Sequence, residues 1–553
     1  MKKRLYLLAA VSVTIGSCGD SNSTTYDTSG LDSTALSAIS VDSYRAHVEV
    51  LSSDEFMGRK PFTKGDTLTI NYIEEQFRSL GLQPGNGTSY FQEVPLVEVT
   101  STPSATSLDF KGKDGVLSVK YLDECVIGSS RLDDQIDVPS TELVFVGFGI
   151  VAPEYNWNDY EGLDVKGKTV VAMVSDPGRY DNTLFKADTM TYYGRWRYKF
   201  EEAGRQGAAG ILLIHETGAA SYGWDVVRTG WSGPQLYLAS TDKTEVVTAF
   251  EGWISNETAH SLFKIGGLDP QIMEAAKKPG FKAVPMNITT EVHIQNTFRH
   301  ATSNNVIAKI EGTKRKDETI IYTAHWDHLG VGERVEGDSI YNGAIDNAAG
   351  VAALFEIAKA FHAAAIRPER TIIFIALTAE EEGLLGSGYY TANPIYPLNK
   401  TVANLNMDAF SALGETKDVS IVGIGQSEIE GYVGRSAAKF GRTVRGEKNP
   451  SSGGFYRSDH FNFVKKGVPG LFMGSGTELL STDTAAMAER RNALEGRYHT
   501  VHDEVDQNWD FEGIIADVKL FFDIGYTMSL EKTFPQFTKK SEFRTLGEKR
   551  LAK

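Results

Sequence analysis

The stretch TIIYTAHWDHLG (319–330) is the starting point for the expected fold class. It consists of a continuous apolar run that leads directly into histidine and aspartate. The run TIIYTA is rich in β-forming residues, which is typical of a strand buried on both faces of a parallel sheet. A helix with one apolar face is predicted over 347–363, and a second buried strand, TIIFIALT, follows at 371–378. This strand–helix–strand order predicts an α/β fold with a mostly parallel central sheet that is sandwiched by helices.

Further elements extend this pattern along the chain. Strands are predicted at VANLNM (402–407), VSIVGIG (419–425) and PGLFMG (469–474), and an amphipathic helix near 514–522 closes the domain. Between 126 and 295 the texture changes to short apolar β-rich runs separated by glycine-rich stretches. We therefore expect this block to form a β-rich domain inserted into the α/β domain.

The composition excludes a collagen-like, a largely disordered and a multi-span membrane protein. Hydrophobic residues make up 41% of the chain and charged residues 23%, as in ordinary globular proteins. The 56 Lys and Arg residues against 72 Asp and Glu residues give a net charge of −16, which argues against nucleic-acid binding. Two cysteines cannot build a disulfide framework, and we expect Cys125 to be a partly buried residue without a role.

The N-terminus has the features of an export signal. Residues 1–18, MKKRLYLLAAVSVTIGSC, combine a positive start with an apolar core that is short for a membrane span. The end of this segment resembles a bacterial lipobox, which implies cleavage before Cys18 and a lipid anchor on that residue. The polar residues that follow predict a flexible tether. We expect an exported protein in the cell envelope, held to a bacterial membrane only through Cys18.

Polar residues follow the ends of three predicted strands, one more precedes a helix, and another lies in RYHTVHDEVD (497–506). In chain order they are His325, Asp327, His328, Asp346, Glu380, Glu381, Glu382, Asp408 and His499. The carboxyl ends of parallel strands meet at one edge of a sheet, so we expect these side chains to converge there. Imidazole and carboxylate ligands together suit Zn²⁺. Two histidines and three carboxylates suit two divalent ions that share one carboxylate.

Several motifs around these residues resemble the co-catalytic di-zinc aminopeptidase family, whose relatives include glutamate carboxypeptidases and the transferrin receptor. They are AHWDHLG (324–330), GDSIYNGAIDNAAG (337–350), TAEEEGLLGS (378–387), VANLNMDAF (402–410), YRSDHFNFVKKGVP (456–469) and YHTVHDEVD (498–506). LSSDEFMGRKPFTKGD (51–66) resembles the N-terminal stretch of the family, and 143–235 resembles its inserted protease-associated (PA) domain. The motifs occur in the order of the family and cover most of the chain.

The resemblance implies a ligand set of five residues. His325 and Asp408 would bind one zinc, Glu381 and His499 the other, and Asp346 would bridge them. Co²⁺ or Mn²⁺ could replace zinc in a site this rich in carboxylates. The peptide bond between Asp346 and the next residue is expected to be cis, as is common in the family.

The resemblance also implies roles around the metals. Glu380 would be the general base, Asp327 would hold the second ring nitrogen of His325, and Tyr498 would donate to the tetrahedral oxyanion. An alternative register, with Glu381 as base and Glu382 as ligand, is disfavoured by the alignment through 383–387. Two substrate-binding candidates are Asp459 and Arg457. The alternative for the segment around Asp459 is that Ser458 is the N-cap of the helix that follows.

The function implied is a zinc exopeptidase that removes N-terminal residues from peptides through a hydroxide shared by two metals. A carboxypeptidase of the glutamate-carboxypeptidase type is an alternative, with Arg457 as the clamp for the terminal carboxylate. A lipid-anchored binding protein with structural metals is another. Glutaminyl cyclisation, which uses one zinc, fits the five-ligand set less well.

The expected organisation follows from these assignments. It comprises a lipoprotein signal (1–17), a flexible tether (18–35), the N-terminal part of the peptidase domain (36–125), a PA-like insertion (126–295), the catalytic domain (296–530) and a loosely docked basic tail (531–553).

Overall fold

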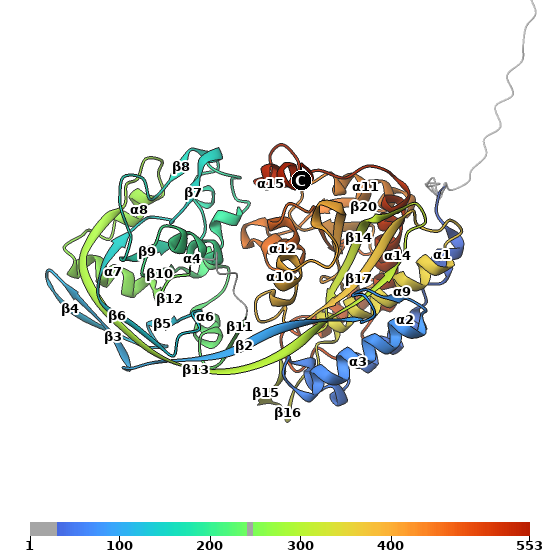
Figure 1. The fold of residues 1–553 in the computed structure, drawn as a ribbon, viewed down its shortest axis with the longest axis horizontal. Coiled ribbons are helices and arrows are strands. Elements are labelled where there is room, and N and C mark those ends of the chain that lie inside the picture. Colours follow the sequence, from blue (N-terminus) through green and yellow to red (C-terminus); the bar gives the residue numbers. More distant parts are fainter. Residues whose placement is uncertain (1–29, 240–246, 553) are drawn as a thin grey trace, which may run out of the picture.

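The computed structural model describes residues 30–239 and 247–552. The chain forms two lobes that are joined by two long antiparallel strands, β2 (Phe91–Pro103) and β13 (Val284–Ile310) (Figure 1). The expected signal segment and Cys18 lie outside the described residues. Within the described ranges, no helix combines the length and the apolar character needed to cross a membrane.

The large lobe, on the right in Figure 1, is built on the predicted sheet. Four parallel strands lie side by side in the order β17 (Arg370–Leu377), β14 (Arg315–His325), β18 (Thr401–Asn406) and β21 (Gly470–Ser475). β13 pairs with the outer edge of β17, and β19 (Asp418–Ile421) pairs with β21, both antiparallel. The predicted mostly parallel central sheet is therefore confirmed.

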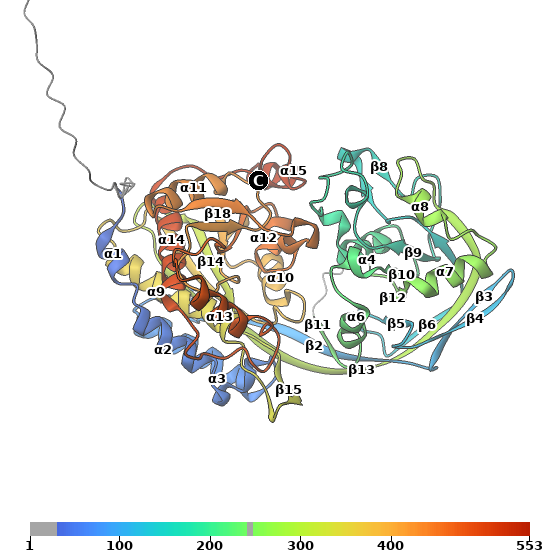
Figure 2. The ribbon, with the colours of Figure 1, turned by 180° about the vertical axis from the view of Figure 1, so that it is seen from behind.

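Helices cover both faces of this sheet (Figure 1 and Figure 2). The helices on one face are α2 (Val41–Leu51), α3 (Lys64–Ser79), α9 (Ala349–Ala363) and α14 (Phe511–Leu530); those on the other are α10 (Leu385–Ala392) and α12 (His460–Lys465). Because neighbouring strand residues point to opposite faces, Ile320 and Tyr322 pack in the first core, and Ile321 packs in the second with Tyr390. The predicted helices over 347–363 and near 514–522 correspond to α9 and α14.

The inserted lobe, on the left in Figure 1, has its own sheet and core. Its parallel strands are β6 (Gln135–Phe145), β9 (Thr169–Met173), β10 (Gly210–His215) and β12 (Phe250–Ser255). The hairpin β3 (Ser107–Gly112) and β4 (Gly115–Lys120) belongs to this lobe, because Phe110 and Val119 share a core cluster with Phe145. The expected boundary at residue 126 therefore falls inside the lobe. The weak alternation of the hairpin sequence concealed its apolar face.

Both ends of the described chain are docked. α1 (Ser33–Ser37) is capped by Asp32, and Ala35 is fully buried, so the prediction of a tether as far as residue 35 is wrong for its last residues. In the tail, α15 (Arg544–Leu551) places Arg550 against the Leu398 and Thr401 carbonyls at 2.7 and 2.6 Å.

Phe537 and Phe543 of the tail are buried in a cluster with Phe455 and Tyr456. The prediction of a loosely docked tail is therefore wrong. It rested on the basic composition of the tail, which does not indicate that these aromatic residues are buried. Cys125 is a fully buried free thiol, more buried than expected, and burial raises its pKa to about 12.

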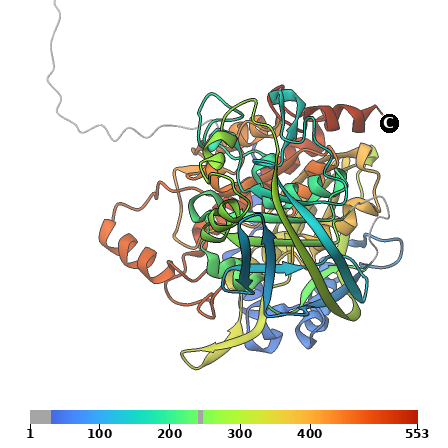
Figure 3. The ribbon, with the colours of Figure 1, turned by 90° about the vertical axis from the view of Figure 1, so that its left-hand side faces the viewer.

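Two elements project from the large lobe, as Figure 3 shows. One is the hairpin of β15 (Gly330–Val335) and β16 (Asp338–Tyr341), and the other is α13 (Thr484–Leu494), which has no buried residue. The hairpin lies in the chain between His328 and Asp346, and α13 ends shortly before His499. Both projections therefore flank the segments that carry the candidate site.

Candidate metal site

The ends of the parallel strands bring the predicted residues together. β14 ends at His325, which pairs in register with Leu377 at the end of β17, and Thr323 pairs with Asn406 at the end of β18. The glutamates that follow β17 and the aspartate that follows β18 therefore lie beside His325. Three groups of side chains could hold a metal ion: His325, Asp346 and Asp408; His328, Asp346, Glu381 and His499; and His325, Glu380 and Glu381.

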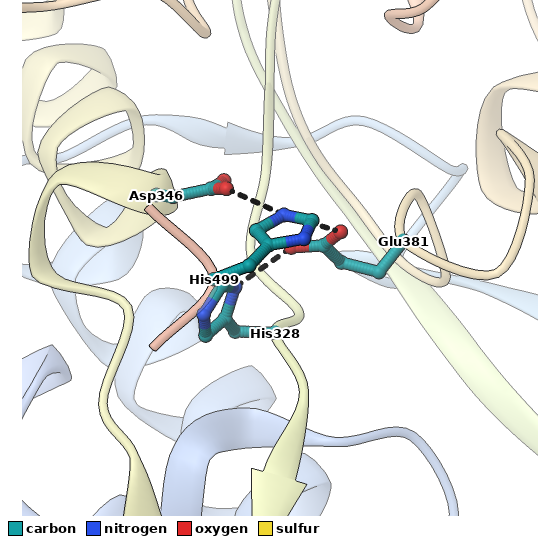
Figure 4. Close-up of side chains that lie close together, drawn as sticks. All are labelled: His328, Asp346, Glu381 and His499. Carbon is teal, nitrogen blue, oxygen red and sulfur yellow. Dashed lines mark hydrogen bonds and ion pairs between the residues drawn. The ribbon is translucent and has the colours of Figure 1, made fainter. Parts of the chain in front are cut away.

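Asp346 lies between two of these groups, and one of its oxygens faces each of them. Its Oδ1 is 3.2 Å from His325 Nε2, and the same nitrogen is 3.0 Å from Asp408 Oδ1. Its Oδ2 is 3.1 Å from His499 Nε2, which is also 3.2 Å from Glu381 Oε2 (Figure 4). This is the arrangement that a bridging carboxylate between two cations requires.

The loop that carries Asp346 is fixed by two buried side chains. Asp503 accepts hydrogen bonds from the backbone N–H groups of Ile345 at 3.0 Å and Asp346 at 3.1 Å. The expected cis peptide bond between Asp346 and Asn347 is present.

Arg59, which is 1% exposed, ties this loop to the strand that carries His325. Its guanidinium donates to the carbonyls of Asn342 and Gly343 at 2.5 and 2.8 Å and to the Trp326 carbonyl at 2.8 Å. Since the strand end and the loop share one rigid donor, His325 and Asp346 have a fixed relative position.

Asp327 holds the site in a different way from the one expected. His325 Nδ1 donates to the backbone carbonyl of Asp327 at 3.1 Å, whereas the Asp327 carboxylate is 3.8 Å from that nitrogen. The carboxylate instead accepts the N–H groups of Glu380 at 3.0 Å and Glu381 at 3.3 Å. The second ring nitrogen of His325 is therefore held by Asp327, but by its main chain, because the side chain is engaged in shaping the glutamate loop.

The two glutamates occupy electrostatically different positions. Burial, together with the charges of Asp408 and Glu381, raises the pKa of Glu380 well above its usual range, although His325 opposes this. For Glu381, burial and Asp346 raise the pKa, but hydrogen bonds from His328 and His499 outweigh them and lower it to about 2. Environments that push the pKa values of two neighbouring acids apart indicate different roles for them.

Glu382 lies outside the cluster. Its carboxylate is 3.5 Å from Lys60 Nζ. The geometry thus agrees with the register in which Glu380 and Glu381, and not Glu382, face the candidate metals.

The remaining candidates lie at the margins of the cluster. Tyr498 is 69% exposed, and its ring stacks on His499 with centroids 3.9 Å apart. Arg457 is exposed and donates to the Ser452 carbonyl at 2.9 Å. Asp459 is fully buried, and its Oδ1 accepts from Ser387 Oγ at 2.5 Å, whereas its Oδ2 has no hydrogen-bond partner among the described residues.

Ser458 does not cap α12, which has no side-chain cap. Its hydroxyl donates to Asp408 Oδ2 and accepts from Asn406 Nδ2 at 2.7 Å. It thereby orients the Asp408 carboxylate so that Oδ1 faces His325.

The site roles implied by the resemblance leave out four residues that build the site: Arg59, His328, Ser458 and Asp503. All four stand in the motifs quoted above, which are LSSDEFMGRKPFTKGD, AHWDHLG, YRSDHFNFVKKGVP and YHTVHDEVD. Arg59 lies more than 260 residues from the Trp326, Asn342 and Gly343 carbonyls, and only the folded chain reveals these contacts.

The charge balance of the cluster suits cations. Among the residues that the structure describes, no Lys or Arg forms an ion pair with Asp346, Glu380, Glu381 or Asp408. Buried carboxylates without a counter-charge are costly, and the nearby histidines alone leave negative charge in excess. Imidazole nitrogens and carboxylate oxygens facing one space are the donors that Zn²⁺ prefers, so the residues present fit divalent metal ions.

The inserted lobe reaches the loops of the site. Arg197 donates to the carbonyl of Gly383, just after the glutamates, at 3.2 Å. Tyr192 packs its ring on Phe461 of α12 at a centroid distance of 4.9 Å. Glu542 of the tail binds Lys186 of the inserted lobe and accepts from Tyr456 at 2.8 Å. The two lobes and the tail therefore meet beside the metal cluster.

Known proteins resemble this chain mainly over the large lobe. Residues 305–522 match the family described as Peptidase family M28. Aminopeptidase NAALADL1 of Mus musculus is 33% identical over 138 residues, which are 24% of this chain and 17% of that protein. A probable zinc metalloprotease of Pyricularia oryzae is 32% identical over 160 residues, which are 29% of each chain. This chain thus spans less than a third of the length of these two relatives.

One solved structure resembles most of the chain. The aminopeptidase from Aneurinibacillus sp. strain AM-1 superimposes with a TM-score of 0.50 at 20% sequence identity, and the match covers 90% of this chain and 95% of that one. The likeness supports the fold class of the whole two-lobed chain.

Proposed function

We propose that this protein, whose residues 305–522 match peptidase family M28, is a two-metal aminopeptidase that removes N-terminal residues from peptides. The observation that carries the proposal is the position of Asp346, whose two oxygens face His325 and His499 at 3.2 and 3.1 Å. In this proposal His325 and Asp408 hold one ion, Glu381 and His499 hold the other, and Asp346 bridges them.

The metal ions, when bound, supply a lowered pKa for water and polarise the scissile carbonyl. The residues of the chain prepare the site for this chemistry. His325 donates its Nδ1 proton to the Asp327 carbonyl at 3.1 Å, so its Nε2 lone pair is available to a cation. Ser458 and Asp327 hold Asp408 and the glutamate loop in place.

Glu380 is proposed as the proton carrier. Its carboxylate is buried beside His325 and has a raised pKa. A raised pKa suits a carboxylate that accepts a proton and then returns it as the carboxylic acid. In peptide hydrolysis it takes a proton from the attacking water and delivers it to the leaving amine. Tyr498, exposed at the rim and stacked on His499, is a candidate donor to the oxygen of the tetrahedral intermediate.

The substrate would enter where the inserted lobe and the large lobe approach each other. Arg197 and Tyr192 bring the inserted lobe against the loop of Gly383 and against α12. We propose that this PA-like lobe narrows the entrance and favours short peptides. The proposed location is the cell envelope of a bacterium, with attachment through a lipid on Cys18.

A matched set of peptides tests the activity. The protein without residues 1–18 is incubated with one peptide in three forms: free at both ends, acetylated at the N-terminus, and amidated at the C-terminus. We expect cleavage that is lost with a chelator, lost on acetylation and retained on amidation.

Two results would contradict the proposal. Cleavage that survives acetylation and is lost on amidation would indicate a carboxypeptidase. Metal-loaded protein that cleaves none of the three forms would indicate a binding protein whose metals are structural.

A further inference from the structure

His328 contacts the metal cluster but has no role in the reaction proposed above. It follows β14 by three residues and is 1% exposed. Its Nδ1 is 2.7 Å from Glu381 Oε1 (Figure 4). The other oxygen of Glu381, Oε2, is the one 3.2 Å from His499 Nε2.

The chemistry of the two partners defines the direction of this hydrogen bond. An ionised carboxylate only accepts, so His328 Nδ1 carries the proton and donates it to Glu381. His328 Nε2 is buried and has no hydrogen-bond partner within the described chain. The ring therefore makes one polar contact, and that contact is with Glu381.

Packing fixes the ring in this orientation. Gly343 has a φ of +58°, and a Cβ atom there would lie 2.6 Å from the Cγ and Cδ2 atoms of His328. The ring also meets the His499 ring edge-on, with centroids 5.5 Å apart and an interplanar angle of 71°. Only a glycine at position 343 leaves room for the His328 imidazole between the Asp346 loop and the ring of His499.

We propose that His328 is a positioning residue that occupies Oε1 of Glu381, so that Glu381 offers only Oε2 to the metal ion it shares with His499. This inference rests on the proposed function, because it assumes an ion at Glu381 and His499. A carboxylate bound through one oxygen takes up a single coordination position and leaves another for water or substrate. Without the donor, both oxygens of Glu381 become available to the ion or the side chain turns away from it.

A direct ligand role for His328 is the competing explanation, because one of its ring nitrogens lies close to possible ligand atoms of Asp346, Glu381 and His499. The distance of 2.7 Å to Oε1 favours the hydrogen bond, since Nδ1, the ring nitrogen that faces Glu381, donates its proton and has no lone pair for a metal. The unprotonated Nε2 points away from Glu381 (Figure 4). The two explanations predict different metal binding in a variant whose side chain at position 328 donates a hydrogen bond but cannot act as an imidazole ligand.

Three variants separate these explanations. His328→Asn keeps an N–H donor on the δ position, His328→Leu removes the donor at similar volume, and His502→Gln alters a histidine that is 51% exposed and lies outside the cluster. Each variant of the full chain is titrated with Zn²⁺ against a competing chelator and with Co²⁺ by visible absorption. Thermal unfolding of the metal-free forms checks that each one is folded.

We expect His328→Leu to bind the ion at Glu381 and His499 about 10- to 100-fold less tightly, as is typical when a hydrogen-bond partner of a ligand is lost. His328→Asn should stay close to the wild type in affinity and in Co²⁺ absorption, and His502→Gln should match it. Unchanged affinity in His328→Leu would overturn the inference. Equal losses in His328→Leu and His328→Asn, with a changed Co²⁺ spectrum in both, would overturn it in favour of direct ligation.

The wild type keeps this test separate from the test of the proposed function. If the wild type binds fewer than two ions, the two-metal proposal itself fails, and this inference fails with it. If the wild type binds two ions and the His328 variants behave as in either contrary result, only the positioning role is wrong.

Discussion

Both lobes bury charged side chains near the ends of parallel strands, but they compensate those charges differently. In the inserted lobe, Lys199 is fully buried near two acids, Asp159 and Asp176, and donates to the Ser175 carbonyl at 2.9 Å. The Asp176 carboxylate accepts from Thr191 N–H and Oγ1 at 2.8 and 2.7 Å. The Asp159 carboxylate accepts from Trp157 Nε1 at 2.8 Å.

In the metal cluster of the large lobe, Asp346, Glu381 and Asp408 face histidines. In the described part of this lobe, no Lys or Arg pairs with these three acids, and the buried Arg59 donates to main-chain carbonyls instead. A network that satisfies its own charges has no need of a ligand, whereas a surplus of converging carboxylates does. The comparison therefore supports a structural role for the first cluster and is compatible with metal binding at the second.

Removal of metal is expected to have the largest effect, and only on the large lobe. Chelation should abolish peptide cleavage and lower the melting temperature, because the carboxylates then repel one another without a cation. Readdition of Zn²⁺ should restore both. Activity assays and calorimetry of the same sample check this. An unchanged melting temperature after verified metal loss would contradict a charge surplus at the site.

Glu380→Gln should reduce kcat by about 10²- to 10⁴-fold while leaving bound metal unchanged. The reason is that Glu380 transfers the proton, whereas the ligands are other residues. The control is Glu381→Gln, which should lose metal as well as activity. Steady-state kinetics together with metal analysis measure both. Near-normal turnover in Glu380→Gln would show that the base is misassigned.

Lys199→Met tests the inserted lobe. Removing one partner of a buried charge network leaves acids without a cation, which costs about 3–5 kcal/mol of unfolding free energy. Metal affinity should not change, since Lys199 lies in the other lobe. Denaturant unfolding and chelator titration measure the two quantities. A loss of metal in a variant that is still folded would mean that the clusters are coupled.

Asp66 provides a smaller, pH-dependent effect within the large lobe. Burial raises the pKa of its carboxyl to about 6, against opposing hydrogen bonds from Ser303 and Phe62. The folded state therefore holds a proton between about pH 4 and pH 6 that the unfolded state has released. Stability is greatest below this window and falls as the pH rises through it.

Asp66→Asn should remove this slope, so the variant becomes more stable relative to the wild type by about 1–3 kcal/mol between pH 4 and pH 6. The difference in unfolding free energy between the two metal-free proteins, measured across that range, reports the effect. A constant difference at every pH would indicate that Asp66 is already ionised in the folded protein.

The sequence was informative wherever strand ends carried chemistry. The apolar runs before His325, Glu380 and Asp408 predicted both the strands and their convergence, since parallel strands share one carboxyl edge. The resemblance supplied the position of the cis bond after Asp346.

Other features depended on contacts that no local pattern encodes. Arg59 reaches carbonyls of two distant segments, and Asp327 uses its main chain where a side-chain contact was expected. The basic tail docks through Phe537 and Phe543, which composition does not distinguish from solvated residues. Side-chain partners far apart in sequence were therefore the part that could not be predicted.

The central claim is that two ions share Asp346, and anomalous X-ray diffraction from crystals of the zinc-loaded protein tests it most directly. We expect two anomalous peaks about 3.5–4 Å apart, one beside His325 and Asp408 and one beside Glu381 and His499, with Asp346 between them. A single peak, or peaks away from Asp346, would contradict the two-metal account.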